Sequence, residues 1–200
     1  MASDRIERFT RTERAVHWVH ATAFMTLLAS GLTLWLPRLS ELVARRPLVK
    51  AVHIDAAVAW LVALAVVVAV GDRRRLRETL RELDLFDDDD LLWLRRHPAP
   101  QGRFNAGQKV NAILTGAFAV LFAVSGTLLW LGERDHAFRF ASTIVLHDGL
   151  TLVSLALFAG HLYLAVLHPA TRHALRGITT GSVDRQWALV HHRKWARGRE

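Results

Sequence analysis

Four long apolar segments dominate the pattern of hydrophobic and polar positions along the chain, and charged segments separate them. The apolar segments cover residues 15–36, 51–70, 110–131 and 140–167. Because a bilayer core about 30 Å thick needs about 20 apolar residues in a helix, each segment is long enough to cross a membrane. The pattern therefore predicts an all-α integral membrane protein, with four transmembrane helices forming one bundle within a single domain, residues 1–200.

The charged residues lie mostly outside the apolar segments, so the chain can be 52% hydrophobic and 22% charged. Most of its Lys and Arg residues lie in the N-terminal segment, the loop 71–109 and the tail 169–200. Since cytoplasmic segments of membrane proteins are enriched in Lys and Arg, we expect these three segments in the cytoplasm. The predicted location is the inner (cytoplasmic) membrane, multi-pass, with both termini cytoplasmic.

Topology also explains the net charge of +8, so we expect contact with membrane lipid and no nucleic-acid partner. The first apolar segment is too long for the core of a signal peptide, and we interpret it as a retained span. The acidic run 87–90 is interpreted as part of a solvated cytoplasmic loop.

The chain has no cysteine and 11 histidines. Without cysteine it cannot itself ligate an iron–sulfur cluster, build a Cys-type zinc site or attach haem covalently. Four histidines lie within or at the ends of the predicted spans, where ionisable residues are rare and usually functional. They are His17, His53, His147 and His161.

The spacing of these histidines predicts two sites at two depths. His147 and His161 are 14 residues apart in one span, on nearly the same helix face and about 21 Å apart along the axis. In the predicted topology His53 lies at the outer depth of His147, and His17 lies at the inner depth of His161. Two facing neutral imidazoles can bind haem iron axially, so we expect two b-type haems stacked across the bilayer.

Several alternatives remain open from the residues alone. His20, one turn from His17, could replace it as a ligand. Gly31 and Gly126 could each leave room for a haem, or serve ordinary helix packing. A haem-free transporter that uses His and Asp for a metal or proton path belongs to another functional class, and it predicts a colourless protein.

Four short stretches point to a known family: ERAVHW at 13–18, FNAGQK at 104–109, and the tail sequences at 181–187 and 191–195. They resemble the gamma subunit, the cytochrome b anchor, of membrane-bound formate dehydrogenase. The spacing of His147 and His161 matches as well, and the resemblance covers nearly the whole chain. FNAGQK is fairly specific to the family, whereas two-haem b cytochromes, including hydrogenase anchors, share the histidine pattern more widely.

The resemblance implies that His17 and His161 bind the haem on the cytoplasmic side, and that His53 and His147 bind the outer haem. One departure from the family is Asp148, directly after His147. An acid there could hydrogen-bond an imidazole and tune the potential of the haem, or face water.

The resemblance also implies that Asn105, Gly107 and Gln108 lie beside a quinone near the inner haem. The amides could donate to a quinone carbonyl, although the residues alone favour a polar cap on the third span. The implied function is electron transfer between formate dehydrogenase outside the cytoplasm, with its iron–sulfur and catalytic subunits, and membrane quinone. A hydrogenase or another molybdenum or nickel–iron oxidoreductase is the alternative partner.

Overall fold

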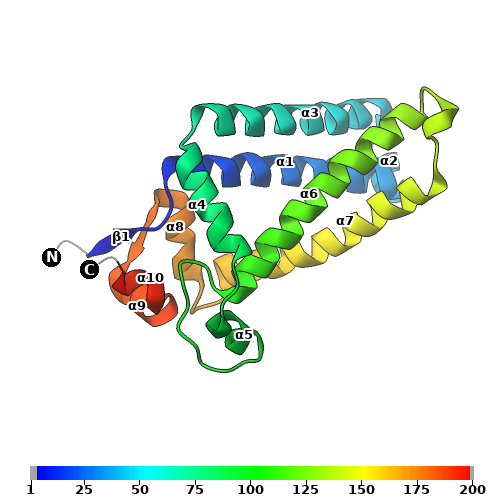
Figure 1. The fold of residues 1–200 in the computed structure, drawn as a ribbon. Coiled ribbons are helices and arrows are strands. Elements are labelled where there is room, and N and C mark those ends of the chain that lie inside the picture. Colours follow the sequence, from blue (N-terminus) through cyan, green and yellow to red (C-terminus); the bar gives the residue numbers. More distant parts are fainter. Residues whose placement is uncertain (1–3, 199–200) are drawn as a thin grey trace. The chain divides into compact units, whose positions relative to one another are not determined.

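Residues 4–198 are described by a computed structural model in which most of the chain is helical (Figure 1). Within that range, four helices are long and apolar enough to cross a membrane. They are α1 (Arg11–Trp35), α3 (Arg46–Val70), α6 (Ala106–Gly132) and the helix Ala141–Leu167, which consists of α7 (Ala141–Leu162) and a π-helical segment η2 (Tyr163–Leu167). The predicted all-α membrane protein with four spans is confirmed at this level.

The first three spans begin four or five residues before their predicted starts, because their first turns contain charged or polar residues. Thr10 caps α1: its Oγ1 accepts a hydrogen bond from the Glu13 N–H, and its own N–H donates to Glu13 Oε2 over 2.7 Å. Such a capping box satisfies backbone donors at a helix start without any apolar residue. Hydropathy alone therefore places these starts too late.

The chain forms two compact units, residues 10–76 and residues up to 9 together with those from 77 onward. In the first unit, α1 and α3 lie side by side as an antiparallel hairpin, with α2 (Pro37–Val43) between them (Figure 1). At one end the Asp72 N–H donates to Thr12 Oγ1 over 3.1 Å, and at the other Arg46 donates to the Leu34 carbonyl over 2.8 Å. These bonds fix the register of the hairpin at both ends.

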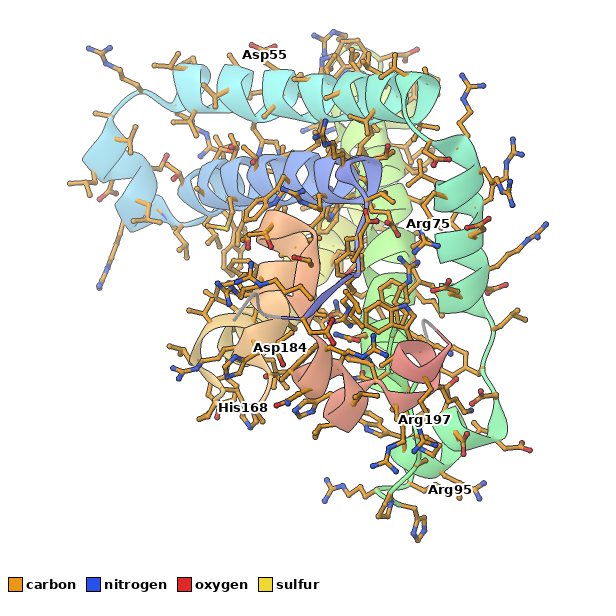
Figure 2. The ribbon with its side chains drawn as sticks, turned by 90° about the vertical axis from the view of Figure 1, so that its left-hand side faces the viewer. Asp55, Arg75, Arg95, His168, Asp184 and Arg197 are labelled. Atoms are coloured by element: carbon orange, nitrogen blue, oxygen red, sulfur yellow. The ribbon has the colours of Figure 1, made fainter. Side chains whose placement is uncertain are left out.

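An exposed acid lies within α3. Figure 2 shows the Asp55 side chain on the side of α3 that faces away from α1. Most of the large apolar side chains of the spans are also partly or largely exposed in the isolated chain. Exposed apolar faces are expected of helices that contact lipid or other membrane subunits.

The second unit contains α6 and α7 side by side, together with the smaller elements outside the spans (Figure 1). These are β1 (Arg5–Glu7), α5 (Asp88–Leu94), η1 (His136–Phe138), η3 (Arg172–Ala174), α8 (Leu175–Thr180), β2 (Ser182–Asp184), α9 (Arg185–His191) and α10 (Arg193–Arg197). α4 (Arg73–Asp84) crosses the boundary between the units. β1 pairs antiparallel with β2, and Val183, Ala188 and Ala196 form a small buried core beside them. The predicted tail is thus a folded segment.

The acidic run 87–90 is only partly the expected solvated loop: Asp87 and Asp88 are exposed, but the run begins the helix α5 and Asp90 is buried. Asp87 caps α5 through a reciprocal capping box with Asp90. Asp90 is 2% exposed and pairs with Lys109 at 2.5 Å, and Asp87 Oδ2 lies 2.8 Å from Lys194 Nζ, which also contacts Asp89. The hydrogen bond from Lys194 lowers the pKa of Asp87, and its two acidic partners raise the pKa of Lys194.

Gly132 lets the last turn of α6 approach the backbone of the following loop. A Cβ at this position would lie 3.0 Å from the Phe138 carbonyl oxygen and 3.2 Å from the Arg139 Cα. Because backbone atoms yield less than side-chain ends, we expect Gly132→Ala to lower the free energy of unfolding by about 1–3 kcal/mol. Gly116→Ala in the same helix meets nothing within 4 Å and is the matched control. It should raise the free energy of unfolding by up to about 1 kcal/mol through helix propensity.

Thermal unfolding of the two variants in the same detergent tests this expectation. A Gly132→Ala protein as stable as Gly116→Ala would contradict the close approach of α6 to the loop.

His192 makes the stability of the second unit depend on pH. The side chain is 2% exposed, and its Nδ1 donates to the Gly102 carbonyl over 2.8 Å. Burial, helped by the charge of Arg8, lowers the pKa of His192 to about 3. An unfolded histidine titrates near pH 6.5. Below that pH the unfolded chain binds a proton that the folded chain does not bind, so stability falls on acidification.

The expected loss is about 1.4 kcal/mol per pH unit between about pH 6.5 and the folded pKa. Unfolding midpoints measured at pH 7.5 and 5.5 should fall more for the wild type than for His192→Asn, whose amide can still donate to Gly102. His97→Asn, in an exposed loop, should behave like the wild type. Equal pH dependence in the wild type and His192→Asn would refute the assignment.

Candidate functional site

His53, on α3, is held by a serine of α1. Ser30 Oγ lies 2.8 Å from His53 Nδ1, and the same hydroxyl donates to the Thr26 carbonyl over 2.7 Å. Because a hydroxyl has one proton, Ser30 accepts its second hydrogen bond from the Nδ1–H of the imidazole. A neutral imidazole protonated at Nδ1 carries its lone pair at Nε2, as a metal ligand requires.

His147, in the other unit, has the same arrangement. Ser125 Oγ on α6 lies 2.8 Å from His147 Nδ1 and donates to the Leu121 carbonyl over 2.7 Å. Ser125 is 0% exposed, so its hydroxyl is shielded from water. The Nδ1 partner is therefore this serine and not the adjacent Asp148. Phe122 lies edge-on to the imidazole, with ring centroids 5.2 Å apart.

A glycine follows each serine and lies beside the same imidazole. A Cβ at Gly31 would lie 3.3 Å from His53 Cε1, and a Cβ at Gly126 would lie 3.6 Å from His147 Cε1. Gly31 thus leaves room for the histidine ring, whereas a Cβ at Gly126 would make only an ordinary van der Waals contact with it. Whether they also leave room for a porphyrin stays a prediction.

Within each unit the predicted ligands are separated by nearly the same distance. His53 contacts Ser30, which lies 13 residues after His17 on α1. At the rise of an α-helix, this contact places His53 about 20 Å from His17 along the axis of α1. His147 and His161 lie 14 residues apart on α7, about 21 Å. Each unit therefore presents one histidine at each of two levels, as two cofactor sites at different depths require.

The other two predicted ligands, His17 and His161, have surroundings that differ from each other. The ring of His17 is edge-on to Trp18, with centroids 5.3 Å apart, whereas His20 packs against Trp60 of α3 at 5.6 Å. Two residues after His161 the α-helical hydrogen bonding gives way to η2, closed by the His168 N–H donating to the Tyr163 carbonyl over 2.9 Å. Such π-helical turns occur frequently at functional sites.

The predicted quinone residues form the start of α6. Asn105 Oδ1 accepts from the Gln108 N–H over 2.9 Å, and Gln108 Oε1 accepts from the Asn105 N–H over 3.1 Å. Gly107 lets Trp93 of α5 pack closely, since a Cβ there would lie 3.0 Å from the ring. The polar-cap interpretation is confirmed. Because both side-chain oxygens accept bonds within the cap, the amide nitrogens are the donors that each side chain can offer a ligand.

A buried arginine beside this cap was not identified from the sequence. Arg8 is 1% exposed and donates to the Arg103 carbonyl over 2.7 Å and to Gln108 Oε1 over 3.3 Å. Arg103 donates to the Arg8 carbonyl in return, over 3.1 Å, and binds Glu82 at 2.6 Å. Burial and the charge of Arg103 lower the pKa of Arg8 to about 9, so Arg8 remains positive at neutral pH. An Arg-Phe pair precedes both α1 and α6 in the sequence, and this repetition is the signal that could have identified Arg8.

Comparison with known proteins identifies the class of cofactor. The family profile described as "Prokaryotic cytochrome b561" matches residues 8–181. The cytochrome b556(fdo) subunit of formate dehydrogenase from Escherichia coli K12 is 26% identical over 210 residues, covering 97% of this chain and 93% of the relative. The nitrate-inducible cytochrome b556(Fdn) subunit of the same strain is 25% identical over 211 residues, covering 98% and 92%. The formate dehydrogenase cytochrome b556 subunit of Haemophilus influenzae is 22% identical over 209 residues, covering 96% and 83%.

These relatives confirm the resemblance to formate dehydrogenase cytochrome b subunits. A cytochrome b carries b-type haem, and this excludes the haem-free transporter. The serine-bound imidazoles of His53 and His147 fit such a group, because each presents the tautomer that binds iron. With its four apolar helices and these histidines, the chain belongs to the prokaryotic cytochrome b561 family and is a membrane electron-transport haem protein.

Proposed function

We propose that this chain is a di-haem cytochrome b subunit that transfers electrons between an oxidoreductase on the outer face of the inner membrane and the quinone pool. Formate dehydrogenase, with iron–sulfur and catalytic subunits, is the partner that the relatives' names favour. A hydrogenase or another molybdenum or nickel–iron oxidoreductase is the alternative partner. The observation that carries the proposal is the matched serine–histidine arrangement at His53 and His147.

In this proposal residues 1–200 act as one bundle that holds two haems, each by two histidines. His53 and His147 bind the outer haem, and His17 and His161 bind the inner haem. The near-equal separations of about 20 and 21 Å within the two units support this pairing by depth. Bound b-type haem supplies the one-electron redox chemistry, whereas the imidazoles set its position and the serines hold the imidazoles.

The start of α6 is the proposed quinone site. Asn105 and Gln108 donate amide hydrogens to a quinone carbonyl, and Gly107, with the Trp93 ring packed against it, lines the site between them. Arg8 adds a buried positive charge, 3.3 Å from Gln108 Oε1, that stabilises negative charge developing on the quinone oxygen. The excess of Lys and Arg in the loop 71–109 supports a cytoplasmic location, from which the quinone would take its protons.

A reduced-minus-oxidised optical spectrum of the purified protein, with a pyridine haemochrome count, tests the haem proposal. We expect two b-type haems per chain. One haem would show that one histidine pair is wrong. A folded protein made with adequate haem supply that contains none would overturn the proposed function.

Asn105→Asp and Gln108→Glu test the quinone site separately, because each keeps the oxygen that the capping box needs and removes the amide donor. Loss of one such hydrogen bond should slow reoxidation of the reduced haems by a soluble quinone analogue about tenfold. Haem content and thermal stability should stay at wild-type values. Unchanged reoxidation in both variants would remove Asn105 and Gln108 from the quinone site.

A further inference from the structure

The beginnings of α1 and α6 share a sequence register. Five pairs of positions are each separated by 95 residues: Phe9 and Phe104, Thr10 and Asn105, Glu13 and Gln108, Ser30 and Ser125, Gly31 and Gly126. Each helix opens with a capping box, and each serine is the 20th residue of its helix. The histidine that each serine contacts follows on the next long helix, 23 residues later in one unit and 22 in the other. The same local arrangement of capping box, serine, glycine and histidine thus occurs twice, once in each unit.

The hydrogen-bond geometry of the two copies is the same. In each, the hydroxyl lies 2.8 Å from an imidazole Nδ1 and donates to the carbonyl four residues earlier over 2.7 Å. Ser30 is 7% exposed and Ser125 is 0% exposed. Thr33 and Thr127 make the same intrahelical bond on the same helices, but both of these bonds are exposed. A hydroxyl that donates to the backbone of its own helix is therefore not special in these helices. The two serines differ because their hydroxyls are buried and also accept a hydrogen bond from an imidazole.

We propose that Ser30 and Ser125 are positioning residues for His53 and His147, and that each fixes the ring orientation and the Nδ1–H tautomer that presents Nε2 to the outer haem. This inference rests on the proposed function. A hydroxyl that already donates to a carbonyl is a stronger acceptor, because hydrogen bonds in a chain polarise one another. Accepting from Nδ1–H makes the imidazole a better electron donor at Nε2, which favours ferric over ferrous iron. Both serines therefore hold the potential of the outer haem low.

Ser30→Ala and Ser125→Ala, made in the full chain, test the proposal, with Thr33→Ala and Thr127→Ala as matched controls. Redox titration should show the midpoint potential of one haem raised in each serine variant, the same haem in both, with the other haem unchanged. The EPR signal of that oxidised haem should shift because its imidazoles are no longer held. Ser30→Thr and Ser125→Thr, which keep the hydroxyl, should restore both values, and the threonine controls should match the wild type.

The outcomes separate this inference from the function on which it rests. Two bound haems with unchanged potentials and EPR signals in both alanine variants would overturn the positioning role and leave the di-haem proposal intact. Shifts in different haems would overturn the pairing of His53 with His147. A wild-type protein without haem would refute the proposed function itself. If an alanine variant fails to fold, Ser30→Cys and Ser125→Cys replace it, since a thiol is similar in size but a weak acceptor, and the same upward shift is expected.

Discussion

His53→Ala and His147→Ala should each leave one b-type haem per chain, where we expect the wild type to bind two. Under the proposed pairing each variant lacks one of the two histidines that would hold the outer haem, and the other pair, about 20 Å away along the helices, should keep its haem. Neither substitution removes a helix hydrogen bond, because Ser30 and Ser125 keep their bonds to the Thr26 and Leu121 carbonyls. Each variant should therefore still fold and should bind one haem.

A pyridine haemochrome assay and the EPR spectrum of the oxidised protein measure this result. His97→Ala and His136→Ala, both exposed and outside the spans, should keep two haems. His20→Ala should also keep two if His17 is the inner ligand. Two haems with wild-type spectra in His53→Ala or His147→Ala would show that the serine-bound histidines are not ligands.

Asp90→Asn should lower the free energy of unfolding by about 3–5 kcal/mol, because it leaves the Lys109 ammonium buried without its carboxylate. Lys109 is 8% exposed, and its Nζ lies 2.5 Å from Asp90 and donates to the Leu85 carbonyl over 2.8 Å. It also lies 5.4 Å from the centre of the Phe86 ring. This cluster anchors the first turn of α6 to α5, directly after Gln108.

Lys194→Met is the matched control, because Lys194 also pairs with aspartates of the same run but its side chain is 39% exposed. Removing such an exposed pair should change the free energy of unfolding by at most about 1 kcal/mol. The double variant Asp90→Leu/Lys109→Met should have a higher free energy of unfolding than Asp90→Leu or Lys109→Met alone, since it leaves no buried charge without a partner. Denaturant unfolding in detergent measures each variant against the wild type. An Asp90→Asn protein within 1 kcal/mol of the wild type would contradict a buried ion pair.

The four spans and the two-level histidine pattern could be predicted from the sequence because both are local properties. Span length follows from bilayer thickness, and the common face of His147 and His161 follows from the helical repeat. The family could be recognised from short stretches such as FNAGQK at 104–109. Pairing of histidines between the two units remains a prediction, because it depends on how separate helices assemble.

The tertiary structure decided which groups hold these side chains. Ser30 and Ser125 lie 23 and 22 residues from the imidazoles that they contact, and only the packing of the helices shows that these side chains meet. The ion pairs of the acidic run were not predicted for the same reason, since Asp90 pairs with Lys109, 19 residues later, and Asp87 pairs with Lys194, 107 residues later. Helix periodicity and hydropathy report a residue's own surroundings along the chain, whereas a buried charge or imidazole is stabilised by whichever distant group folding brings to it.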